Sequence, residues 1–140
     1  MFEASERYRP IVQGIMRIVV AFLYWSHGAQ KLMGWFGGFG PDGGTADLGT
    51  IFGAAGIIEF FGGLLLILGL LTQPVAFLVS GEMAVAYFTQ HMPNGGFWPW
   101  DNRGEVVAAF CFVFLFFAFA GAGAFSLDGL LRRRRQKVQG

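Results

Sequence analysis

Four long apolar segments dominate the sequence and constrain its fold more than any motif does. They cover residues 11–33, 51–71, 74–91 and 106–125. Each has about 20 residues, the length that an α-helix needs to cross the ~30 Å hydrocarbon core of a bilayer. Only 14% of the 140 residues are charged, whereas a soluble domain has about 25%. We therefore predict an all-α, polytopic membrane protein whose four transmembrane helices form one bundle, a single domain.

The distribution of basic residues predicts the orientation of this bundle. The C-terminal tail has Arg132 to Arg135 and Lys137, and the N-terminus has Arg7 and Arg9, but the two long loops have only Arg103. By the positive-inside rule, both termini are cytoplasmic and both long loops face outward. Residues 126–140 then form a basic cytoplasmic tail. Such a run could also bind lipid head groups or nucleic acid, but we interpret it as a topology anchor and expect no nucleic-acid partner.

Several ionisable residues fall inside the apolar segments. Charged side chains are costly in hydrocarbon, so they usually face the interior of a bundle and have partners. On the first segment Arg17, Tyr24, His27 and Lys31 lie within an arc of roughly 80°. On the second, Glu59 shares a face with Gly56 and Gly63, and small residues allow helices to approach closely. The sequence thus predicts polar contacts between helices.

Depth along each helix suggests which charges meet. Arg17 and Glu82 lie about 9–12 Å from the cytoplasmic edge at 1.5 Å per residue, so we predict a structural ion pair between them. His27 and Glu59 lie at a similar depth from the outer edge. They form, with Lys31 and with Glu105 at the start of the fourth helix, a predicted outer polar cluster.

The outer polar cluster is the candidate site. His27 would exchange protons near physiological pH, Glu59 would orient it, and Lys31 would attract an anionic donor. Trp98 and Trp100 would border the mouth and contact the substrate. A purely structural role in fixing helix register is the alternative for all these charges.

Other chemistry is weakly supported. Zinc ligation by His27, His91 and Glu59 matches no dedicated metal spacing, so we predict no metal site. Cys111 is the single cysteine, which excludes an intrachain disulfide and a Cys-x-x-Cys pair. Phenylalanine occupies 17 positions, and an aromatic, glycine-lined cleft between helices would suit a flat ligand such as a quinone. Lipid packing explains most of these rings equally well.

The chain resembles the DoxX family of small four-helix bacterial membrane proteins. The resemblance rests on RIVVAFLYWSHGAQKLMG, GIIEFFGGLLLILGLLTQPVA, GEMAVAYF, NRGEVVAAF and GAGAFSLDGLL. The positions that carry it are Arg17, His27-Gly28, Lys31, Glu59, Gly62-Gly63, Glu82, Glu105 and Ser126-Leu127-Asp128. It implies a bacterial inner-membrane location and membrane-bound redox work with quinones, thiols or small sulfur compounds.

We therefore expect a subunit of a membrane oxidoreductase, linked to quinone and to oxidative stress, with no intrinsic cofactor or cysteine pair of its own. Its partners would be membrane lipids and soluble or membrane redox proteins, in an oligomeric state that the sequence leaves open. A small-solute or proton-coupled transporter is the main alternative, and a structural anchor for a soluble enzyme is another.

Overall fold

The computed structural model describes residues 2–139 and is helical throughout its regular structure, apart from one β-bridge between Phe39 and Gly44. The helices are α1 (Phe2–Met33), α2 (Ile51–Ile57), η1 (Ile58–Gly62), α3 (Gly63–Leu68), α4 (Thr72–Ala86), η2 (Tyr87–His91), η3 (Met92–Asn94), α5 (Pro99–Asn102), α6 (Glu105–Ala120) and α7 (Leu127–Gln139). The all-α prediction is confirmed.

The apolar segments correspond to continuous helical stretches, with some shifts at their ends. α2, η1 and α3 follow one another without a break, as do α4 and η2, and α1 starts well before residue 11. α6 ends at Ala120, because Gly121 adopts a positive φ of 79°. Within the described residues, one helical stretch, Ile51–Leu68, is long and apolar enough to cross a membrane, and α6 is apolar but shorter.

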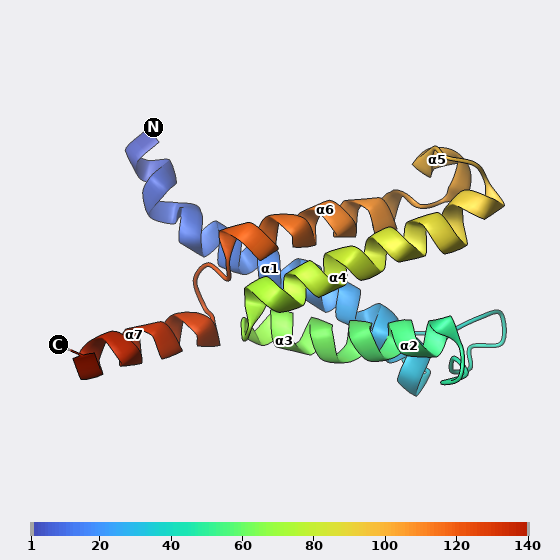
Figure 1. The fold of residues 1–140 in the computed structure, drawn as a ribbon, viewed down its shortest axis with the longest axis horizontal. Coiled ribbons are helices and arrows are strands. Elements are labelled where there is room, and N and C mark those ends of the chain that lie inside the picture. The colour runs from blue at the N-terminus through green and yellow to red at the C-terminus, as the bar shows by residue number, and fades with distance from the viewer. Residues whose placement is uncertain (1, 140) are drawn as a thin grey trace.

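The helices pack as two pairs (Figure 1). α1 lies along α2, η1 and α3, while α4 lies along α6, and fewer contacts join one pair to the other. The pairs meet near the turn between α3 and α4 and diverge toward α2 and α5 (Figure 1). Fully buried apolar side chains fill the junction: Tyr24, Leu66, Val79, Phe114 and Phe117.

Two glycines allow the first pair to pack closely. A Cβ added at Gly28 of α1 would lie 2.3 Å from the backbone nitrogen of Phe60, and one added at Gly63 would lie 2.7 Å from Cβ of Trp25. Neither position has room for a larger residue without moving a backbone. This close approach sets the distance across which side chains of α1 and η1 can meet.

Arg17 holds together the end of the bundle where α3 and α6 terminate. Its side chain is fully buried and donates to the backbone carbonyls of Leu66, Ile67, Ala122, Ala124 and Phe125. The last carbonyls of a helix lack intrahelical partners, so a guanidinium with five N–H groups is well suited to satisfy them. The predicted ion pair between Arg17 and Glu82 is wrong. The guanidinium donates to backbone carbonyls, and Glu82 accepts a hydrogen bond from the Tyr24 hydroxyl of α1.

Candidate functional site

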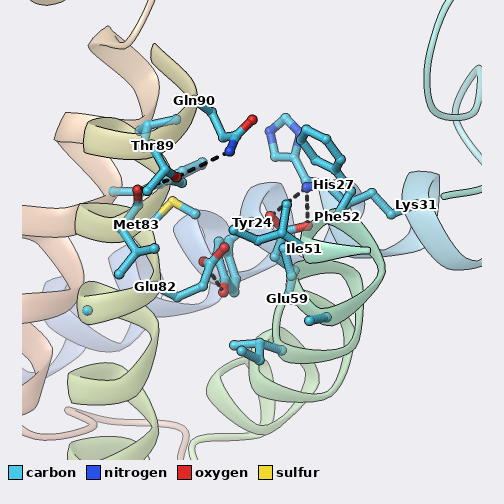
Figure 2. A pocket seen from close by; sticks show the side chains of 18 of the residues that line it. Tyr24, His27, Lys31, Ile51, Phe52, Glu59, Glu82, Met83, Thr89 and Gln90 are labelled. Carbon is cyan, nitrogen blue, oxygen red and sulfur yellow. Dashed lines mark hydrogen bonds and ion pairs between the residues drawn. The ribbon is translucent and has the colours of Figure 1, made fainter. Parts of the chain in front are cut away.

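A cleft of about 950 Å³ lies between the two helix pairs, in the half of the bundle where they diverge. Apolar side chains make up most of its walls, among them Phe52 and Ile58 on one side and Leu78 and Phe110 on the other. α1, α2, η1, α4, η2 and α6 all contribute residues. Figure 2 shows that a few polar side chains project into this apolar space.

Lys31 and Glu59 form an ion pair in the cleft. The Lys31 ammonium donates to both Glu59 carboxylate oxygens at 2.6 Å, and the two side chains are only 14% and 4% exposed (Figure 2). Glu59 lies in η1, a π-helical turn inside an otherwise α-helical stretch, and such turns are frequent at functional sites. Depth along the helices predicted His27 as the neighbour of Glu59. The structure pairs Glu59 with Lys31 instead, a member of the same predicted cluster.

Tyr24 and Glu82 form a second polar pair deeper in the cleft. The Tyr24 hydroxyl donates to Glu82 Oε2 at 3.0 Å, and the Tyr24 ring packs edge-on against Phe114 with centroids 5.0 Å apart. Tyr24 precedes Lys31 by about two turns, so their Cα atoms lie about 10 Å apart along α1. Glu82 therefore belongs to the cleft and not to the Arg17 network.

The other predicted site residues have different surroundings. His27 lines the cleft on the same face of α1, with its ring 6.2 Å from that of Phe110. Glu105 is exposed and is not a lining residue. Trp98 and Trp100 stack on each other at 5.0 Å, are 54% and 63% exposed, and also lie outside the cleft lining.

A family model for DoxX matches residues 13–92. The chain belongs to the DoxX family. An uncharacterized protein of Haemophilus influenzae is 42% identical over 126 residues, which cover 88% of this chain and 92% of that protein. No solved structure matches it.

DoxX is a membrane family, so the chain is a membrane protein. The region matched by the DoxX model runs from α1 to η2 and contains both polar pairs and His27. Glu105, Trp98 and Trp100 lie beyond it. The matched region thus contains every polar residue of the cleft lining except Arg103.

Four polar cleft residues were not singled out as site residues from the sequence: Tyr24, Thr89, Gln90 and Arg103. Glu82 was assigned only to a structural ion pair. Arg103 follows α5 in a left-handed conformation with φ of 58°. Arg103 is the one basic residue in the two long loops, and this feature of the sequence could have identified it as a candidate site residue. His91, considered above only as a zinc ligand, also lines the cleft, and its Nδ1 lies 3.1 Å from the carbonyl oxygen of Asn102.

The arrangement is suited to hydrogen bonding and proton exchange. Within residues 2–139 no three His, Cys, Asp or Glu side chains cluster closely enough to hold a metal ion. The cleft instead offers an ammonium, a phenol, two carboxyl groups and imidazoles, against apolar walls. An apolar pocket with a few convergent polar groups is the usual form of a small-molecule site.

Proposed function

We propose that this DoxX protein crosses a bacterial inner membrane four times with both termini in the cytoplasm. The spans would be α1, the stretch 51–68, the stretch 72–91 and α6. The basic helix α7 lies at the end of the bundle opposite α5 and the 34–50 loop (Figure 1), which agrees with the positive-inside rule. The cleft then lies in the outer half of the membrane.

The cleft is proposed to bind a lipid-soluble quinone, and the chain to act as a subunit of a membrane oxidoreductase. The observation that carries this proposal is the presence of two polar pairs, Lys31–Glu59 and Tyr24–Glu82, in a mostly apolar cleft of about 950 Å³. A quinone has a flat ring with carbonyl oxygens and an apolar tail. The Lys31 ammonium has a third N–H that can donate to such an oxygen, and the Tyr24 hydroxyl can donate to one when a protonated Glu82 donates to Tyr24 instead. The aromatic walls suit the ring.

Access from the bilayer is supported by the exposure of the cleft walls. Phe77 and Leu78 of α4 are 65% and 57% exposed, and Phe52 of α2 is 36% exposed, yet all three line the cleft. α2 and α4 belong to different helix pairs. A hydrophobic ligand could thus pass between them without crossing water.

A bound quinone would supply an acceptor for two electrons and two protons. Oxidation of two thiols to one disulfide releases the same two electrons and two protons, so a thiol or small sulfur donor balances the reaction. The Tyr24–Glu82 pair would hold a proton inside the cleft, and Lys31 would neutralise Glu59. His27, near the open side, would exchange protons with water. A chain with one cysteine, Cys111, does not form its own dithiol, so the electrons would come from a partner or directly from the donor.

The test is to purify the protein with its co-purifying partners and to measure bound quinone and thiol-dependent quinone reduction. Tyr24→Phe removes one hydroxyl and keeps the packed ring, and Glu59→Gln is nearly isosteric. Each should lower the reduction rate by about 10²-fold, the lower end of what a positioned proton-transfer group contributes. Glu105→Gln is the matched control, because it removes an exposed carboxylate outside the cleft.

Folded Tyr24→Phe and Glu59→Gln proteins with normal quinone reduction would defeat this proposal. Solute flux into liposomes without any quinone reduction would instead favour the transporter.

A further inference from the structure

A second groove lies at the other end of the bundle. It has a volume of about 570 Å³ and lies between the end of α3, the 121–126 loop and the start of α7. Its walls include Leu68, Phe125 and Leu130, and its one charged lining residue is Arg133. Leu68 is 45% exposed and Phe125 is 65% exposed, so no part of the described chain covers these apolar walls.

Hydrogen bonds between α7, the 121–126 loop and neighbouring segments fix the walls of this groove. Arg17 donates to the carbonyls of Ala124 and Phe125. At the start of α7, the Asp128 backbone N–H donates to the Gly69 carbonyl at 2.9 Å. The Asp128 carboxylate accepts from the backbone N–H groups of Leu71 and Thr72, both at 2.9 Å. These contacts hold the first turn of α7 beside the end of α3, which is the level of the inner membrane surface in the proposed orientation.

The charge of α7 points to an anionic occupant. Arg132 to Arg135 and Lys137 are basic, and the single acidic residue of the helix, Asp128, is engaged with the start of α4. No other helix of the described chain packs extensively on α7 (Figure 1). Basic residues beside a membrane span attract anionic lipids.

We propose that this groove binds an anionic phospholipid. Arg133 contacts the phosphate of the head group, and one acyl chain lies along Leu68, Phe125 and Leu130. The combination of one cation and continuous apolar walls fits a phospholipid better than a free phosphate or a nucleic acid, which would leave the apolar walls uncovered. The proposal rests on the proposed orientation of the bundle and not on quinone binding.

The experiment is a lipid titration of the full-length protein in detergent, followed by native mass spectrometry. The probes are phosphatidylglycerol, which is anionic, and phosphatidylcholine, which has no net charge. We expect one tightly bound phosphatidylglycerol and weaker binding of phosphatidylcholine. Arg133→Gln should weaken phosphatidylglycerol binding about fivefold, the effect of one basic residue near an anionic membrane surface.

Arg135→Gln is the matched control, because it removes the same charge from the same helix outside the groove lining. It should change the affinity by less than about twofold if the groove is the site. Leu130→Ser should weaken binding of the phospholipid without changing the charge. These readouts are independent of redox activity, so they separate this proposal from the quinone proposal.

Three results would overturn the lipid site. Equal effects of Arg133→Gln and Arg135→Gln would show a diffuse attraction to the whole helix. Displacement of phosphatidylglycerol by glycerol phosphate at the same concentration would show that the acyl chain contributes nothing. Preferential binding of a short RNA that depends on Arg133 would show that α7 binds nucleic acid instead.

Discussion

Replacing Arg17 by leucine should destabilise the protein severely and without any dependence on Glu82. The substitution removes a fully buried guanidinium that donates to five backbone carbonyls, two near the end of α3 and three in the 121–126 loop after α6. A buried polar group left without a partner costs about 1–3 kcal/mol. If relaxation and water leave only two of the five carbonyls unsatisfied, the cost is still about 2–6 kcal/mol.

The assay is equilibrium unfolding in detergent with three variants, Arg17→Leu, Glu82→Leu and the double substitution. If Arg17 acts through carbonyls alone, the two effects should add to within about 0.5 kcal/mol, as for independent sites. Arg17→Lys should recover only part of the lost stability, because one ammonium with three donors cannot reach all five carbonyls. A double variant clearly more stable than the sum of the single effects would refute this account and restore the ion pair.

Three further predictions concern the contacts that build the cleft and the start of α7. Lys31→Met should cost about 3–5 kcal/mol of unfolding free energy, because it leaves the buried Glu59 unpaired. Adding Glu59→Met should recover stability in thermal unfolding, and effects of the two substitutions that simply add would contradict the pair. Gly28→Ala should cost about 1–3 kcal/mol of stability, because the added methyl pushes α1 away from η1. Gly81→Ala is the control and should not destabilise the protein, because a Cβ added there meets nothing within 4 Å. Equal melting temperatures for the two variants would be inconsistent with this packing. Burial disfavours the charged form of Asp128, but the backbone N–H groups of Thr72 and Leu71 outweigh it and hold the pKa of this carboxyl below its usual value. Because the folded-state pKa is depressed, the stabilisation is present above the unfolded pKa of about 3.9 and is lost as the pH falls through the folded value. Wild type should therefore exceed Asp128→Asn in stability at pH 6 and lose that advantage below about pH 4, and a difference that persists unchanged in acid would contradict the assignment.

The sequence alone determined the helical class and the grouping of Lys31 and Glu59 in one polar cluster. Long apolar segments with few charges leave little choice but helices that bury their backbone polar groups internally. Lys31 lies two residues inside the end of its apolar segment and Glu59 lies eight residues inside its own, so depth alone did not match them. Opposite charges attract strongly in a low-dielectric interior, and the long, flexible lysine side chain spans the difference in depth.

The positions of the loop residues relative to the cleft depend on contacts that no periodicity in the sequence reveals. Asn102 donates to the Gly96 carbonyl and accepts from the backbone N–H of Gly104, and Tyr87 donates to the Phe97 carbonyl. These bonds set the path of the chain between η3 and α6. They leave Glu105, Trp98 and Trp100 outside the cleft lining and place Arg103 in it.

The partners of Arg17 and Glu82 were decided only by the tertiary structure. Counting depth identified both residues as buried, and charge suggested that they pair with each other. Arg17 instead meets carbonyls that become available where α3 stops at Gly69 and α6 stops at Gly121, both with positive φ. Glu82 turns to Tyr24, because α4 packs on α6 and faces α1 across the cleft. Carbonyl and hydroxyl groups can satisfy the hydrogen bonds of a buried ionisable side chain without an opposite charge. Which one a charge meets depends on where helices end and how they pack, and the pattern of charges does not contain that information.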